Sequence, residues 1–247
     1  MLLVHGFPYD HRMWRGQLDG LAGAARVVAL DLPGFGETPP RGDGLSATTM
    51  DELADEVIAL ADALGLSRFV LGGLSMGGYV ALALARRHPE RLLGLALCDT
   101  RAEPDADAKR IDRARDADDV LAHGVTKQRD EIPQVMLSPE TLARRRDLVE
   151  ALQAMISRTS RAGWAAAQRG MVERRDARAD LARIAVPTLC LGGTDDVITP
   201  PDGLRRMAEA IPGAEVEIVP NAGHMTPLEQ PETVNLLIRR LLGRIPR

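Results

Sequence analysis

Short apolar runs alternate along the chain with longer segments in which apolar residues recur every three or four positions. The runs are rich in Val, Leu or Ile, as strands buried on both faces of a parallel sheet are. This alternation predicts an α/β fold, in which a mostly parallel sheet is wrapped by helices. Six strands are expected, over residues 2–4, 25–30, 68–72, 92–98, 187–192 and 214–219.

The segments between these runs carry helix-end signals. Residues 51–64 have the clearest ones, because Thr49 and Glu52 form a Thr-x-x-Glu capping box and Gly65 stands where a C-terminal cap is wanted. Pro89 stops the next helical pattern. Further helices are therefore expected over residues 76–88, after residue 202, and over residues 231–242.

Residues 101–180 interrupt the alternation. They are rich in Arg, Asp and Ala, lack a strand-like run, and are typical of several short amphipathic helices. We expect a core domain made of residues 1–100 and 181–247, with residues 101–180 inserted as a helical cap. Its charged runs are interpreted as solvated helix faces. Most residues of its apolar minority should hold the cap together, and some should face a site: Ile132, Met136, Leu137, Met155, Trp164 and Met171.

Length, charge and cysteine content narrow the class of protein. A chain of 247 residues can bury one large core. Its 31 basic and 35 acidic residues give a net charge of −4, which argues against a cationic face for nucleic acid. The apolar runs are far shorter than the roughly 20 residues that span a bilayer, and Cys98 and Cys190 are expected to be free and buried. We expect a cytoplasmic protein that binds a small molecule, and neither nucleic acid nor membrane.

Ser75 is the candidate nucleophile. It lies in Gly-Leu-Ser-Met-Gly, residues 73–77, between an expected strand and an expected helix. A sharp strand-to-helix turn needs glycine on both sides, exposes the hydroxyl, and puts a helix N-terminus behind it to favour developing negative charge. The alternative interpretation is a glycine-rich connection of the kind found in any α/β protein.

His224 is the candidate general base. It follows the last expected strand, in Asn-Ala-Gly-His-Met, where a loop can bring it over the carboxyl ends of the sheet, the edge at which open α/β sheets bind ligands. A neutral imidazole near Ser75 can accept the hydroxyl proton and return it to a leaving group. His11, His88 and His123 are expected to be surface or structural residues.

An acid should fix the tautomer of His224 and stabilise its charged form. Asp196 is the preferred candidate, because it directly follows a strand and lies between Ser75 and His224, in the Ser, acid, His order of this mechanism. Asp99 and Asp195 are alternatives. Attack on a carbonyl also needs donors to the oxyanion. The amide N–H of Met76, next to the nucleophile, and that of Phe7, in the loop after the first strand, are the candidates.

Five segments, in order and nearly spanning the chain, carry a resemblance to the α/β-hydrolase superfamily: residues 5–8 (His-Gly-Phe-Pro), 31–36 (Asp-Leu-Pro-Gly-Phe-Gly), 73–78 (Gly-Leu-Ser-Met-Gly-Gly), 193–200 and 221–224. Within it the chain looks most like bacterial carboxylesterases and enol-lactonases. The resemblance implies an eight-stranded sheet, a helical cap after the sixth strand, and a triad of Ser75, Asp196 and His224.

The start of the chain departs from the family pattern, which has two further strands before the His-Gly loop. We expect either a natively short chain or a trimmed one. The strand over residues 25–30 would then lie at an edge open to pairing. A partner subunit, as in a homodimer, or neighbouring loops would cover it.

These residues predict hydrolysis of a carboxylic ester through an acyl-serine intermediate, with no metal and no organic cofactor. Branches of the superfamily with a carboxylate nucleophile, the dehalogenases and epoxide hydrolases, are excluded by Ser75. Three alternatives stay open. They are hydrolysis of a lactone, for which Arg101 could bind a substrate carboxylate, perhydrolysis with hydrogen peroxide in place of water, and a non-catalytic receptor of the same fold.

Overall fold

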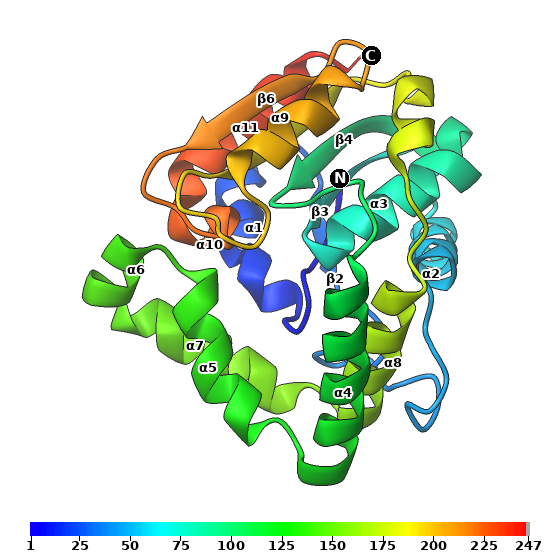
Figure 1. Ribbon diagram of the computed structural model, residues 1–247. Helices are drawn as coiled ribbons and strands as arrows, with labels where there is room; N and C mark the ends of the chain where they lie inside the picture. The colour runs from blue at the N-terminus through cyan, green and yellow to red at the C-terminus, as the bar shows by residue number, and fades with distance from the viewer. Residues whose placement is uncertain (246–247) are drawn as a thin grey trace.

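The computed structural model describes residues 1–245, which contain a six-stranded parallel sheet (Figure 1). The strand order is β2-β1-β3-β4-β5-β6, and each neighbouring pair is parallel. The expectation of a mostly parallel sheet is confirmed, and each expected strand forms, with the second starting three residues late. The strands are β1 (Leu2–Val4), β2 (Val28–Leu30), β3 (Phe69–Leu74), β4 (Leu92–Cys98), β5 (Thr188–Gly193) and β6 (Glu215–Val219).

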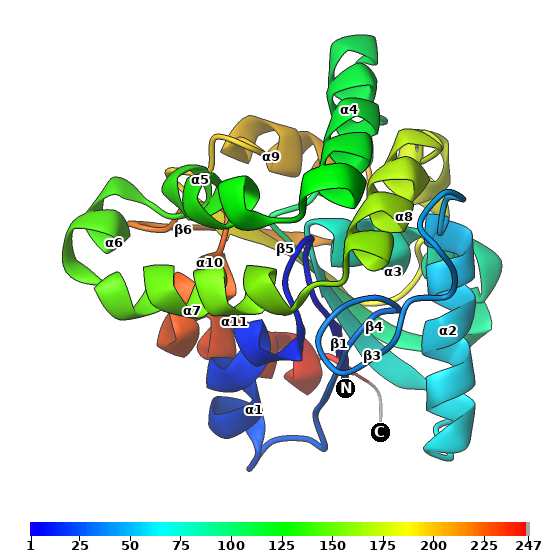
Figure 2. The same cartoon turned by 90° about the horizontal axis from the view of Figure 1, so that it is seen from below.

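Helices cover both faces of the sheet (Figure 2). On one face lie α2 (Met50–Ala63), α3 (Met76–Arg87) and α9 (Pro201–Glu209); on the other lie α1 (Arg15–Leu21) and α11 (Pro231–Gly243). The capping box of Thr49 and Glu52 is formed at the start of α2. The remaining short helices are α10 (Thr226–Glu229) and the 3-10 turns His11–Trp14, Pro89–Arg91 and Arg178–Arg183.

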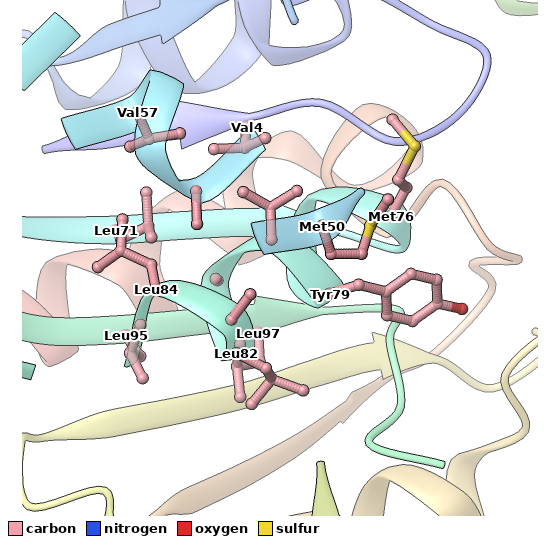
Figure 3. Close-up of a cluster of buried hydrophobic side chains, with 14 of the residues drawn as sticks. Val4, Met50, Val57, Leu71, Met76, Tyr79, Leu82, Leu84, Leu95 and Leu97 are labelled. Carbon is pink, nitrogen blue, oxygen red and sulfur yellow. The ribbon is translucent and has the colours of Figure 1, made fainter. Parts of the chain in front are cut away.

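Two clusters of buried apolar side chains fix the sheet between these helices. Figure 3 shows the cluster under α2 and α3, where Val57 and Leu84 pack over Val4, Leu71 and Leu95 of β1, β3 and β4. Each such side chain contributes about 1.5 to 3 kcal/mol when it leaves water. Both cysteines are free and buried, as expected. The loops at the strand ends therefore stand on a rigid base.

The insertion follows β4 and consists of five helices: α4 (Asp107–His123), α5 (Thr126–Met136), α6 (Pro139–Arg144), α7 (Arg146–Arg158) and α8 (Arg161–Val172). They lie together on one side of the sheet, drawn in green in Figure 1. There α4 packs against α8, and α5 packs against α7. These helices fall within the predicted segment of residues 101–180.

Strand β2 lies at an edge, as predicted, since within residues 1–245 it pairs with β1 alone. The eight strands implied by the family resemblance are six in this part of the chain. A partner subunit over β2 stays a prediction. Among the described helices, none has the length and apolar character needed to cross a membrane.

Candidate active site

Ser75 lies at the turn from β3 into α3 in a backbone conformation that serine rarely adopts. Its φ is 52° and its ψ is −110°, in the region that favours glycine. Hydrogen bonds of its backbone hold it there. The Ser75 amide donates to Cys98 O at 2.9 Å, and its carbonyl accepts from Thr100 Oγ1 at 2.8 Å and from Gly78 N at 2.9 Å. The strained turn is thus fastened to the end of β4.

The two glycines of the motif are required because backbones meet at this turn. A Cβ on Gly73 would lie 2.2 Å from Gly77 O, and a Cβ on Gly77 would lie 2.3 Å from Val4 O. Both distances are far below van der Waals contact. The start of α3 can therefore approach β1 and β3 only with glycine at these positions.

Replacing Gly77 with alanine is expected to destabilise the fold by about 1 to 3 kcal/mol, the usual range for overpacking a well-packed site. The matched control is Gly243→Ala at the end of α11, where an added Cβ meets nothing within 4 Å. That variant should gain up to about 1 kcal/mol, because alanine is the better helix former. Urea unfolding of both variants measures the difference, and equal stabilities would contradict the close approach at Gly77.

His224 lies in the loop between β6 and α10 and is buried, with 1% of its surface exposed. Its amide donates to Met136 O, at the end of α5, at 2.7 Å. The Glu229 carboxylate accepts from Gly223 N and from Ser138 N, each at 2.8 Å. The loop that carries the imidazole is therefore tied to the inserted helices.

Asp196 lies three residues after the end of β5 and accepts a hydrogen bond from His224, with 2.8 Å between Oδ2 and Nδ1. Thr199 Oγ1 donates to the same oxygen at 2.6 Å, and the amides of Ile198 and Thr199 donate to Oδ1. Burial alone would raise the pKa of Asp196, but the charge on His224 and these hydrogen bonds outweigh it and hold the pKa below its usual value. Asp196 is therefore a charged acceptor.

This contact sets the tautomer of the imidazole. A carboxylate only accepts, so Nδ1 of His224 carries the proton and Nε2 is the acceptor. Nε2 has no hydrogen-bond partner among the described residues, and His224 lines the same cavity as Ser75. The arrangement can therefore take up a proton on the cavity side.

The other two candidate acids lie differently. Asp99 accepts from Thr226 Oγ1 at 2.7 Å and from Gly193 N at 3.2 Å, and in residues 1–245 it has no hydrogen bond with the imidazole. Burial, and next the charge of Asp196, raise its pKa well above the usual value. Asp195 is exposed and contacts Thr194. The geometry supports Asp196, the preferred candidate.

The cavity has a volume of about 320 Å³, and its walls come from the sheet edge and from the insertion. Phe7 lines it, and a Cβ on the preceding Gly6 would lie 3.5 Å from Ser75 Cβ, so the loop after β1 adjoins the serine. Met76 is the first residue of α3. In the described chain, the amides of Phe7 and Met76 donate to no protein acceptor. Both N–H groups are thus available, and their role as oxyanion donors stays a prediction.

More of the apolar residues singled out in the insertion face the cavity than expected. Leu137 and Met155 are buried among the inserted helices and the sheet. The other four line the cavity: Ile132, Met136, Trp164 and Met171.

The remaining histidines have structural contacts. His5 is buried and accepts from Leu32 N at 3.0 Å, while His11, His88 and His123 each contact an aspartate. Burial lowers the pKa of His5. Two groups of described residues have metal-ligating atoms within 4.8 Å of one another, Asp10 with His11 and Asp31, and Asp99 with Asp196 and His224. In both groups the hydrogen bonds within the protein already explain the arrangement.

Sequence reasoning missed the residues that hold the site in place. Thr199 stands three positions after Asp196, a spacing at which a hydroxyl can reach back, so a signal existed. Glu229 and Thr226 gave no such signal, because their partners are distant in sequence. Ser138 is 91 positions from Glu229, and Asp99 is 127 positions from Thr226.

The chain is similar in sequence and fold to known proteins. The family model described as alpha/beta hydrolase fold matches residues 1–231. A solved thermophilic esterase from Thermogutta terrifontis, with malate bound, is 42% identical, with a TM-score of 0.95 over 98% of this chain and 88% of that one. The enol-lactonase from Burkholderia xenovorans LB400 is 27% identical, with a TM-score of 0.89 over 98% and 90%.

A curated relative is longer than this chain. The dihydrolipoyllysine-residue acetyltransferase component of the acetoin cleaving system from Pseudomonas putida is 32% identical over 239 residues. The match covers 95% of this chain but 61% of that protein. The chain therefore spans about three fifths of the length of this relative.

Proposed function

Since this chain belongs to the α/β-hydrolase fold family, we propose that it hydrolyses carboxylic esters of small molecules through an acyl-serine intermediate. One observation supports this most. His224 is held by Asp196 at 2.8 Å through Nδ1, while its Nε2 is unpartnered in the described chain and belongs to a cavity that Ser75 also lines. A nucleophile, a base and an orienting acid are the parts that acyl transfer to serine needs.

The reaction proceeds in two steps, acylation of Ser75 and hydrolysis of the acyl-serine. Ser75 Oγ attacks the ester carbonyl carbon while His224 Nε2 accepts the hydroxyl proton, and collapse of the intermediate breaks the bond from carbon to the alcohol oxygen. His224 gives the proton to that oxygen, and the alcohol leaves. Water then attacks the acyl-serine, His224 accepts its proton, and the carboxylic acid leaves as the proton returns to Ser75.

Two local features would lower the barrier. The amides of Phe7 and Met76 would donate to the oxyanion, and each such donor is worth roughly 10² to 10³ in rate. The start of α3 adds the positive end of a helix dipole beside Ser75. Residues 101–180 would act as a cap, because α5 and α8 supply side chains to the cavity.

A lactone is the second candidate substrate, since the same residues open a ring ester and the chain is similar to an enol-lactonase. A panel of short p-nitrophenyl esters and of γ- and δ-lactones separates the two. Faster turnover of the esters supports the proposal, and turnover confined to lactones replaces it with the second candidate. Absence of turnover on both would leave a binding protein of the same fold.

The rate of ester hydrolysis is expected to fall as the pH is lowered, because a protonated His224 cannot accept the proton of Ser75. Asp196 does not produce this loss, since its lowered pKa keeps it charged into the acidic range. Rates with a substrate that has no ionising group, measured between pH 9 and pH 4, test the prediction. Circular dichroism at each pH provides the control for folding, and a flat profile for a folded protein would exclude His224 as the base.

A further inference from the structure

The cavity has two chemically different sides. Near the end of α5, where His224 N contacts Met136 O, the lining is apolar: Ile132, Val135, Met136 and Ile198. The start of α5 adds Lys127, Gln128 and Glu131 to the lining. On the other side it includes Tyr79 of α3, Arg101 after β4, and Arg113 of α4. Figure 1 shows where these helices lie, with α5 on the side of α10 and α4 beside α8. Tyr79 extends away from the apolar cluster below it (Figure 3).

A buried carboxylate organises the polar side. Asp105, whose side chain is fully buried, accepts from three arginines. Arg113 Nε donates at 2.6 Å, Arg101 Nη2 at 2.9 Å, and Arg174 Nη2 at 3.4 Å. The Arg174 guanidinium also stands 3.6 Å above the centre of the Tyr79 ring. Three positive charges therefore share one negative charge.

A second carboxylate joins this network through an amide. Gln168 Oε1 accepts from Arg113 Nη1 at 2.7 Å, and Gln168 Nε2 donates to Asp116. Asp116 also accepts from Trp164 Nε1 at 2.7 Å. Within this hydrogen-bonded network three arginines face two aspartates, and the negative charge of Glu103 also acts on Arg101. The lining also includes two lysines and two carboxylates outside this network: Lys109, Lys127, Asp112 and Glu131.

The network also has more donors than acceptors. Arg101 Nε and Arg174 Nε and Nη1 have no hydrogen-bond partner within residues 1–245. The exposed fractions of the side chains are 29% for Arg101, 11% for Arg113 and 6% for Arg174. Arg101 is therefore the most exposed arginine of the network, it lines the cavity, and its Nε has no hydrogen-bond partner among the described residues.

We propose that the acyl part of the substrate carries a carboxylate that binds Arg101, so that the enzyme acts on monoesters of dicarboxylic acids. The inference rests on the proposed function. His224 returns its proton to the alcohol oxygen, so the alcohol lies on the apolar side next to His224 and the acyl chain extends to the opposite side, toward Arg101. A carboxylate there supplies an acceptor of opposite charge to Arg101, and guanidinium groups bind carboxylates with strong, oriented hydrogen bonds.

Two matched esters test this. Monoethyl glutarate carries the carboxylate, and ethyl 5-methylhexanoate has an isopropyl group of similar shape in its place. Hydrolysis by the full chain is followed in a pH-stat at low salt. The wild type should have a kcat/KM for the glutarate at least 10-fold above that for the neutral ester. In Arg101→Gln the ratio of kcat/KM for the glutarate to kcat/KM for the neutral ester should fall roughly 10- to 100-fold, mainly through a higher KM for the anion.

The control is Arg110→Gln on α4. It removes the same charge, but Arg110 is half exposed and does not line the cavity. In this variant the ratio of kcat/KM for the glutarate to that for the neutral ester should stay within about twofold of the wild-type ratio. Thermal melting followed by circular dichroism checks that all variants fold. A wild-type preference for the neutral ester, or equal changes in the two variants, would overturn the inference while leaving the esterase proposal intact. If the wild type hydrolysed both esters no faster than Ser75→Ala does, the proposed function itself would be overturned.

Discussion

Replacing Ser75 with alanine is expected to lower kcat for ester hydrolysis by about 10⁶-fold, the size of loss seen when a serine hydrolase loses its nucleophile. Without Oγ the acyl-enzyme cannot form, and His224 has no hydroxyl proton to accept. Turnover of p-nitrophenyl acetate measures the loss. Binding of substrate should change little, because alanine keeps the shape of the turn.

Ser157→Ala is the matched control for this variant. Ser157 is exposed on α7, where its hydroxyl donates to Gln153 O, and it does not line the cavity. That enzyme should keep the wild-type rate. If Ser75→Ala kept more than about a tenth of the activity in a folded protein, another residue would be the nucleophile.

Replacing Asp196 with asparagine is expected to lower kcat by up to about 10⁴-fold, the size of loss that serine proteases show when their orienting acid is changed in the same way. The asparagine amide would donate to His224 Nδ1. The imidazole would then carry its proton on Nε2, where it cannot accept one from Ser75. Rates above and below neutral pH, together with thermal melting, measure the effect.

Asp99→Asn is the matched control, because Asp99 lies beside Asp196 and is also buried. We expect it to change kcat less than about 10-fold. If Asp99→Asn were the more damaging change, the assignment of the acid would be wrong.

The same variant should show a pH-dependent gain in stability. Burial, and next the charge of Asp196, raise the pKa of Asp99, so the fold favours its neutral form. That contribution to stability is full below the pKa of the unfolded chain and is lost as the pH rises toward the folded value. Asparagine stays neutral, so the melting temperature of Asp99→Asn relative to wild type should increase from pH 5 to pH 8.

The architecture was predictable because its signals are local. Buried parallel strands are short apolar runs, and the start of α2 carries its own capping box, so strands and helices were found with small shifts at their ends. The turn at Ser75 was predictable for a similar reason. Its glycines are needed because backbone atoms come close together there, both within one strand-turn-helix unit and against β1.

The supports of the candidate site depend on long-range contacts and were not predictable. Glu229 fastens the His224 loop to Ser138, and Asp105 gathers Arg101, Arg113 and Arg174 from three separate segments. In a chain whose basic residues are arginine at all but two positions, sequence alone could not distinguish these from arginines on solvated helix faces. Arg101 was a candidate carboxylate ligand from the sequence, but its unpartnered Nε and its place in the cavity lining follow only from the packed structure.

The residue that a fluorophosphonate probe modifies tests the central claim most directly, because the probe phosphonylates a serine only where a base activates it. Tandem mass spectrometry of the labelled, digested protein should find the adduct on Ser75. Labelling should be slowed in His224→Ala and absent in Ser75→Ala. An adduct on a different serine, or undiminished labelling of Ser75→Ala, would contradict the account.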